Sequence, residues 1–178
     1  MMPNVIGLKC LLCGKRYSTD EIDYVCPDHG NDGIVDVVYD YDAIAKSLTR
    51  EDLARHTDFS MWRYKPLLPV MPETPVPPLA IGFPPLYPHQ RLARALGLNS
   101  VWIKDDGRLP TASFKDRASA IAVMKAHETN AEVITTASTG NAAAALSGIC
   151  AAVGLANVIF VPESAPKAKI AQLLVYGS

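Results

Sequence analysis

The sequence predicts an α/β protein whose parallel strands are covered by helices on both faces, preceded by a small zinc-ribbon-like module. Beyond residue 88, short strand patterns alternate with helical patterns, and this alternation is typical of βαβ units in a parallel sheet. The 178 residues are 49% hydrophobic, which is the level of a globular protein. Three of the four cysteines lie within the first 26 residues. The expected domains are therefore 1–33, 34–88 and 89–178.

The first segment, 1–33, is short, polar and rich in turns, and it contains a candidate metal cluster. Cys10 and Cys13 form one C-x-x-C pair, and after twelve intervening residues Cys26 and His29 form a C-x-x-H pair. Three soft ligands and an imidazole at this spacing favour tetrahedral zinc. His29 is the weakest member, and a surface histidine is the alternative. Structural zinc would let so small a module fold, because metal-binding energy becomes folding energy.

The second segment, 34–88, combines strand and helix patterns with a proline-rich stretch. A strand is expected at 35–39, followed by two helical patterns, and Thr49 with Asp52 resembles a capping box that opens the second helix. Nine prolines lie between Pro66 and Pro88, where they prevent a helix or a central strand. We expect an extended covering segment, with a proline-rich ligand for another domain as the alternative.

The third segment, 89–178, contains the alternating pattern. It predicts helices and strands at 90–96, 101–104, 113–126, 132–136, 141–153, 158–161 and 166–175. The helix at 141–153 is apolar nearly all round, so we expect it to be buried, and Cys150 within it is expected to be a core residue. The chain ends directly after the helix expected at 166–175, where the next strand of the pattern would follow. This position favours a fragment of a longer protein.

Charge and hydropathy exclude several classes of protein. Lysine and arginine number 17 against 18 aspartate and glutamate residues, so no global positive field is available to bind nucleic acid or anionic lipid. No apolar run reaches the roughly 20 residues that span a bilayer, and the N-terminus has no signal-peptide pattern. We expect a cytoplasmic protein with no nucleic-acid or membrane partner. The sequence leaves open whether it forms a homo-oligomer.

The loop 104–117 follows an expected strand and enters an expected helix. We expect it at the carboxyl edge of the parallel sheet, where α/β proteins bind ligands. Lys115 would lie in the first helical turn, where the helix dipole disfavours a cation, so its amine suits covalent modification or a nearby phosphate. A solvated charged turn at 115–117 is the alternative. The expected apolar stripe of this helix consists of Phe114, Ala118, Ile121 and Ala122.

The next strand-to-helix loop, 136–143, carries small hydroxyl residues and a glycine at the expected helix start. Backbone N–H groups exposed there form an anion site. The alternative is that Ser138 or Thr139 is only an N-cap and that Gly140 only relieves crowding.

Residues 110–117, PTASFKDR, resemble the lysine motif of threonine synthases and their relatives among the fold-type II, tryptophan synthase beta-like enzymes that use pyridoxal 5'-phosphate (PLP). Residues 138–141, STGN, resemble the second family motif, and Ala112 replaces the commoner glycine of the first. The resemblance implies that Lys115 holds PLP and moves protons, that Asn141 and Phe114 contact the cofactor, and that Ser138, Thr139 and Gly140 bind the substrate carboxylate. Many such sequences also carry an N-terminal cysteine cluster.

The resemblance implies a PLP-dependent lyase of threonine biosynthesis that converts O-phospho-L-homoserine and water to L-threonine and phosphate. A related enzyme, such as a cysteate synthase or a threonine dehydratase-like enzyme, is one alternative. The other is a non-catalytic fragment or a zinc-ribbon interaction module, because the family's phosphate cup comes later in the chain. We therefore expect negligible activity from residues 1–178 alone. For Lys167 we expect either a contact with the substrate phosphate or a place on the charged, solvent-facing N-terminal face of a helix.

Overall fold

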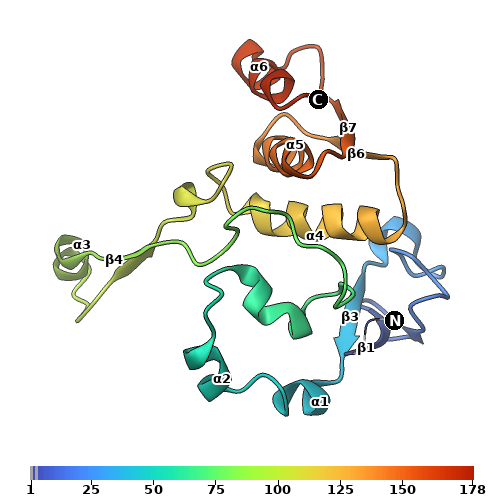
Figure 1. The fold of residues 1–178 in the computed structure, drawn as a ribbon, viewed down its shortest axis with the longest axis horizontal. Helices are drawn as coiled ribbons and strands as arrows, with labels where there is room; N and C mark the ends of the chain where they lie inside the picture. Colours follow the sequence, from blue (N-terminus) through green and yellow to red (C-terminus); the bar gives the residue numbers. More distant parts are fainter. Residues whose placement is uncertain (1, 3) are drawn as a thin grey trace. The chain divides into compact units, whose positions relative to one another are not determined.

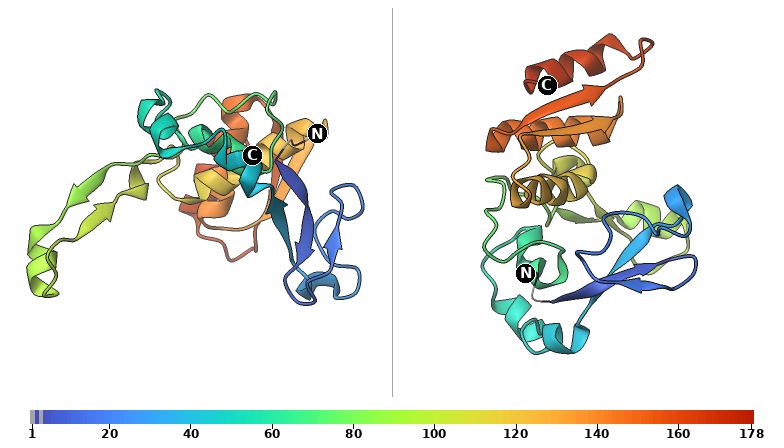
Figure 2. Two further views of the ribbon diagram at one scale, coloured as in Figure 1. Left: turned by 90° about the horizontal axis from the view of Figure 1, so that it is seen from below. Right: turned by 90° about the vertical axis from the view of Figure 1, so that its right-hand side faces the viewer.

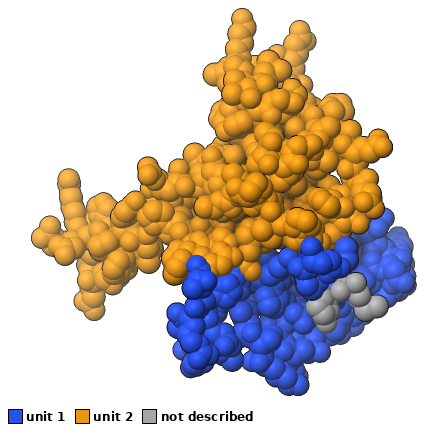
Figure 3. All heavy atoms as spheres, viewed as in Figure 1, with its two compact units in different colours: residues 1–57, 63–73 blue, residues 58–62, 74–178 orange. Residues whose placement is uncertain are grey.

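The computed structural model describes residue 2 and residues 4–178, which form two compact units (Figure 3). One unit contains the residues up to Thr57 together with Arg63–Glu73, and the other contains Asp58–Trp62 together with Thr74–Ser178. No helix in the described part of the chain is long and apolar enough to cross a membrane.

The first unit contains a small antiparallel sheet with the strand order β2-β1-β3. Its elements are β1 (Val5–Cys10), β2 (Arg16–Tyr17), the short 3₁₀ helix η1 (Gly30–Asp32), β3 (Val35–Tyr39), α1 (Tyr41–Ala45) and α2 (Arg50–Arg55). Leu8 of β1 pairs with Tyr17 on one side and with Val37 on the other. The sequence predicted β3 but not β1 or β2, and β3 joins the cysteine-rich segment to the residues that follow it.

The capping box predicted at the start of the second helix is confirmed. Asp52 N–H donates to Thr49 Oγ1 over 3.1 Å, and Thr49 N–H donates to the Asp52 carboxylate over 3.2 Å. Two backbone donors at the helix N-terminus are thereby satisfied.

The second unit contains two separate pairs of strands. Its elements are β4 (Leu86–Pro88), α3 (Gln90–Ala95), β5 (Trp102–Lys104), η3 (Asp106–Arg108), α4 (Lys115–Glu128), β6 (Val133–Ala137), α5 (Asn141–Val153), β7 (Ala156–Phe160) and α6 (Lys167–Val175). The 3₁₀ segment η2 (Met61–Leu67) has its first two residues in this unit and the others in the first unit. Strands β6 and β7 are parallel, with Val133 opposite Ala156 and Ala137 opposite Phe160. The predicted βαβ unit, β6-α5-β7, is confirmed.

The strand predicted at 101–104 exists, but its expected place in the parallel sheet is wrong. β5 pairs antiparallel with β4, with Leu86 opposite Lys104, and β4 is a three-residue strand at the end of the proline-rich stretch. The helix α3 connects the two strands (Figure 2). The lysine loop therefore follows a strand of an antiparallel pair.

Helices α4 and α5 pack side by side in the second unit (Figure 1). The expected burial of α5 is confirmed for its central residues, which include Ala143, Ala144, Ala145, Leu146, Ser147, Ile149 and Cys150. Most of these side chains are small, and small side chains let a neighbouring helix approach closely. The packing places the helix that begins at Lys115 against the helix that begins at Asn141.

The apolar stripe predicted for α4 is wrong. Phe114 is 57% exposed, and Ala118 and Ala122 are also exposed. The buried face lies elsewhere on the helix and consists of Asp116, Ser119, Ala120, Val123, Met124 and Ala126. Both faces carry apolar residues at helical spacing, so periodicity alone could not decide between them.

Candidate functional site

The lysine loop turns sharply before it enters α4. The Asp105 side chain accepts a hydrogen bond from Gly107 N–H and caps η3. Arg117 donates to both oxygens of Asp106, at 2.8 and 3.3 Å, and this guanidinium holds the pKa of Asp106 below its ordinary value. Two ends of the loop that are eleven residues apart are thereby tied together.

Lys115 is the first residue of α4 and is half-buried. Its backbone N–H donates to Ser113 Oγ over 3.2 Å, and its Nζ lies 5.2 Å from the centre of the Phe114 ring. Lys115 is thus only partly shielded from solvent, and its amine stands beside the Phe114 side chain, which is 57% exposed.

Asp116 turns away from solvent, unlike the residue before it. Its side chain is completely buried and accepts hydrogen bonds from the backbone N–H of Thr111, over 2.9 Å, and from the Thr111 hydroxyl. The alternative of a solvated charged turn at 115–117 is therefore wrong for its central residue.

Ala112 has a backbone φ of +59°, in the left-handed region that costs an L-residue about 1–2 kcal/mol.

Replacing Ala112 with glycine is expected to raise the free energy of unfolding by about 1 kcal/mol. Glycine removes the backbone strain, but it also increases the conformational entropy of the unfolded chain, which offsets part of the gain. Urea unfolding monitored by circular dichroism measures the change. The matched control, Ala122→Gly in the exposed interior of α4, is expected to lose about 1 kcal/mol, and a loss at both positions would contradict the prediction.

The asparagine loop begins at the carboxyl end of β6. Ser138 N–H donates to the carbonyl of Phe160 on β7 over 3.2 Å, and Gly140 N–H donates to Ser138 Oγ over 3.1 Å. Gly140 occupies the N-cap position of α5, without a side-chain cap. The alternative that Ser138 or Thr139 is the N-cap is therefore wrong. Thr139 lies half-buried between Ser138 and Gly140. Asn141 is the first residue of α5, and its side chain is exposed.

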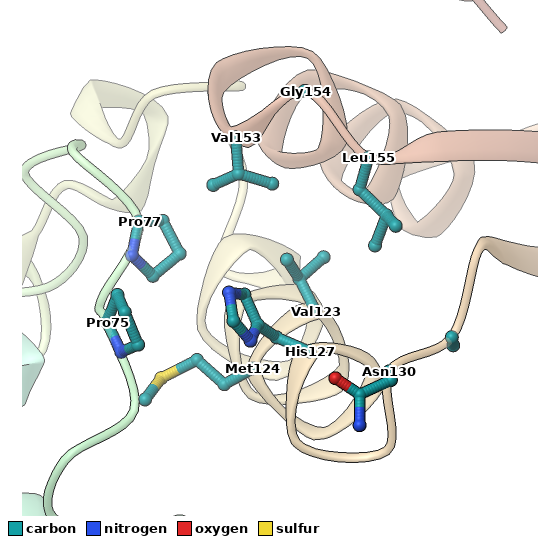
Figure 4. Close-up of a pocket in the computed structure, with 10 residues that line it drawn as sticks. Pro75, Pro77, Val123, Met124, His127, Asn130, Val153, Gly154 and Leu155 are labelled. Atoms are coloured by element: carbon teal, nitrogen blue, oxygen red, sulfur yellow. The ribbon is translucent and has the colours of Figure 1, made fainter.

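The two loops lie at corresponding ends of the two packed helices. A cavity of about 320 Å³ is lined by residues from the C-terminal halves of α4 and α5, among them His127 and Val153 (Figure 4). Because both helices end there, their first residues, Lys115 and Asn141, lie at the opposite ends, away from this cavity. None of the candidate cofactor or substrate residues lines it.

Thr111 connects the lysine loop to α5. A Cβ added to Gly148 would lie 2.7 Å from the Cγ2 methyl of Thr111, closer than real side chains approach. Only glycine at this position lets the loop rest on the helix. The loop that carries Lys115 and the helix that carries Asn141 are thus in direct contact.

Gly148→Ala is expected to lower the free energy of unfolding by about 1–2 kcal/mol, because the added methyl overpacks the contact with Thr111. An alanine inside a free helix would instead stabilise it by about 1 kcal/mol. Thr111 cannot rotate away without losing its hydrogen bond to Asp116. Denaturant unfolding of Gly148→Ala, Thr111→Ser and the double variant measures the coupling.

Serine keeps the hydroxyl of residue 111 and removes the methyl, so the double variant is expected to be more stable than Gly148→Ala. Equal losses with and without Thr111→Ser would contradict the proposed contact.

The cysteine-rich module brings the four predicted metal ligands together. The Sγ atoms of Cys10, Cys13 and Cys26 and a ring nitrogen of His29 all lie within 4.8 Å of one another. Cys26 Sγ is 4.0 Å from Cys13 Sγ and 3.4 Å from His29 Nδ1, and Cys10 Sγ is 3.9 Å from the same nitrogen. Tetrahedral zinc, with bonds of about 2.3 Å to sulfur, separates its ligand atoms by about 3.8 Å. The donor set and its spacing fit zinc.

Backbone hydrogen bonds form both knuckles. Gly14 N–H donates to the carbonyl of Cys10 over 3.0 Å, and Gly30 N–H donates to the carbonyl of Cys26 over 2.9 Å. Both glycines have positive φ, +74° and +52°, which suits a glycine after the second ligand of each pair. These turns bring the two ligands of each pair to the same side of the knuckle.

Tyr17 is a neighbour of the cluster that the sequence did not reveal. Its hydroxyl lies 3.0 Å from Cys26 Sγ, and this contact, with help from His29, lowers the pKa of the Cys26 thiol to about 6. The same contact raises the pKa of Tyr17 to about 12. The thiolate is the form of cysteine that binds metals. Cys150 lies buried in α5, where burial raises the pKa of its thiol to about 11.

Comparison with known proteins defines the class. The profile of the pyridoxal-phosphate dependent enzymes matches residues 78–178, so the chain belongs to this family. The threonine synthase of Methanocaldococcus jannaschii is 37% identical over 171 residues, which are 96% of this chain and 41% of the relative. The cysteate synthase of Methanosphaerula palustris is 32% identical over 165 residues, which are 89% of this chain and 35% of the relative.

A solved structure supports the same class. The chain resembles a pyridoxal 5'-phosphate-dependent aspartate racemase with a TM-score of 0.51 and 26% identity, over 53% of this chain and 31% of the racemase. The predicted fold class, an α/β PLP enzyme of fold type II, is confirmed by this likeness and the family match. The chain spans about two fifths of the length of the threonine synthase it resembles.

Proposed function

We propose that this chain is the cofactor-holding part of a threonine synthase and that Lys115 is the residue that binds PLP covalently. The observation that carries the proposal is the position of Lys115, which is half-buried at the start of α4. The next two residues, Asp116 and Arg117, are hydrogen-bonded back to the loop that precedes the lysine, at Thr111 and Asp106. An amine, backbone N–H groups at the start of α5 and the amide of Asn141 are donors of the kinds that PLP and an amino-acid carboxylate require.

The chain's own residues have distinct proposed roles. PLP, when bound, withdraws electrons from the substrate carbon. Lys115 holds the cofactor and carries protons at the substrate carbons, while Phe114 and Asn141 orient the ring. Ser138, Thr139 and the backbone of Gly140 bind the substrate carboxylate.

The proposed reaction converts O-phospho-L-homoserine and water to L-threonine and phosphate. Relatives named threonine synthase support it, at 37% and 40% identity over 96% of this chain. A cysteate synthase at 32% identity keeps a related lyase as the second candidate. We also propose that the cluster of Cys10, Cys13, Cys26 and His29 holds structural zinc, on the strength of its ligand spacing.

Trapping of the bound cofactor tests the proposal. The purified chain is incubated with PLP and reduced with borohydride, which turns a lysine-bound cofactor into a stable amine, and the peptides are mapped by mass spectrometry. A phosphopyridoxyl group confined to the peptide of Lys115 is the expected result. A group scattered over surface lysines would contradict it.

The substrate class has its own readout in the same experiment. O-Phospho-L-homoserine added before reduction is expected to lower the yield of the Lys115 adduct, because the substrate amine competes with lysine for the cofactor. L-Homoserine, which lacks the phosphate, is the matched control. Equal competition by the two compounds would argue against recognition of a phosphorylated substrate by this chain.

A further inference from the structure

Asp116 directly follows the proposed cofactor lysine, but its carboxylate is buried whereas Lys115 is only half-buried. Its exposed fraction is 0%, and its two oxygens accept from the backbone and the hydroxyl of one residue, Thr111. A buried carboxylate is retained only where hydrogen bonds compensate for its lost hydration. Its place in the first turn of α4 is also favourable, because the helix dipole stabilises an anion there.

The two hydrogen bonds between Asp116 and Thr111 close a ring of six residues, 111–116, that includes the backbone of Lys115. Within that ring lie Ala112, whose φ is +59°, and Ser113, whose Oγ accepts from Lys115 N–H. A strained backbone persists only where its surroundings hold it in place. The carboxylate of Asp116 is the group that closes this ring.

The same ring also contacts α5, the helix that carries Asn141. The methyl group of Thr111 rests against Gly148 of α5, and α5 begins at Asn141. Thr111 thus touches Asp116 with its hydroxyl and α5 with its methyl. A shift of Thr111 would therefore change the position of Lys115 relative to the loop that precedes α5.

We propose that Asp116 is a positioning residue. It fixes Thr111, and through Thr111 it sets where α4 begins and where the amine of Lys115 stands relative to α5. It does not touch the cofactor or the substrate itself. The proposal rests on the proposed role of Lys115 as the cofactor residue.

The test compares Asp116→Ala and Asp116→Asn in the full chain. Three quantities are measured: the rate of PLP trapping at Lys115, the rate at which acetic anhydride labels its amine, and hydrogen exchange at the amide of Thr111. Asp116→Ala is expected to slow PLP trapping roughly tenfold, because small misplacements of a reacting group cost large factors in rate. Its Thr111 amide is expected to lose protection.

Asparagine keeps one oxygen that accepts from Thr111 N–H, so Asp116→Asn is expected to recover most of the trapping rate and the protection. A structural control separates positioning from general destabilisation. Ser147→Ala removes a buried hydroxyl of α5 that is bonded to Ser178, and it is expected to leave PLP trapping at Lys115 unchanged.

If Asp116→Ala trapped PLP as fast as Ser147→Ala, the positioning role would be overturned. If the unaltered chain trapped no PLP at Lys115, the proposed function would fail separately. In that case, acetic anhydride labelling and hydrogen exchange would still decide whether Asp116 fixes the loop. Unchanged values of both in Asp116→Ala would overturn the inference.

Discussion

Lys115→Ala is expected to abolish the borohydride-stable phosphopyridoxyl adduct at residue 115 and to leave only the background labelling of surface lysines. The reason is chemical, because no other group at the start of α4 can form the bond that reduction preserves. The fold is expected to survive, since the side chain is only half-buried and alanine favours a helix. Peptide mass spectrometry measures the adduct, and circular dichroism checks the helices.

Lys167→Ala is the matched control for this experiment. Lys167 also opens a helix, α6, and its side chain is exposed. The adduct at Lys115 is expected to persist in this variant. A single-site adduct that appears on another lysine in Lys115→Ala, or loss of the Lys115 adduct in Lys167→Ala, would contradict the assignment of Lys115 as the cofactor lysine.

Cys13→Ser is expected to release zinc and to unfold the cysteine-rich module. Cys13 is exposed, whereas Cys10 and Cys26 are fully buried core residues, so its replacement removes a ligand without opening a cavity. Structural zinc supplies on the order of 10 kcal/mol to the folding of small modules. Without it, the small core of Leu8, Cys10, Tyr17 and Cys26 has little to hold β1 against β3.

Native mass spectrometry counts zinc per chain, and hydrogen exchange at β1 and β3 reports the folding of the module. One zinc ion is expected in the unaltered chain and in Cys150→Ala, and none in Cys13→Ser. A strong chelator is expected to have the same effect on exchange as Cys13→Ser. Full protection of β1 and β3 in chelator-treated protein would contradict a folding role for the metal.

The local elements were predictable because neighbouring residues decide them. Helix α5 occupies the predicted range, 141–153, since Gly140 precedes it and Gly154 ends it in the left-handed conformation, at a φ of +72°. Strand β3 and the Thr49–Asp52 capping box also follow from adjacent residues. Steric and hydrogen-bonding preferences within four or five residues set these features.

Long-range strand pairing was predictable for the βαβ unit β6-α5-β7 but not for β5 or β1. β5 was expected in the parallel sheet, yet it pairs with the short proline-bounded strand β4. β1 was missed because the strand that covers it, β3, begins 25 residues after β1 ends. The direction and the partner of a strand depend on contacts across the chain, which local pattern does not contain.

The sequence by itself determined the candidate chemistry, since the motifs around Lys115 and Asn141 and the spacing of the three cysteines and His29 are local. Only the tertiary structure decided how those groups are held. It buried Asp116 against Thr111, rested Thr111 on Gly148, and placed Tyr17 against Cys26. Each of these contacts joins residues that are apart in the sequence, and each depends on which faces are excluded from water when the elements pack.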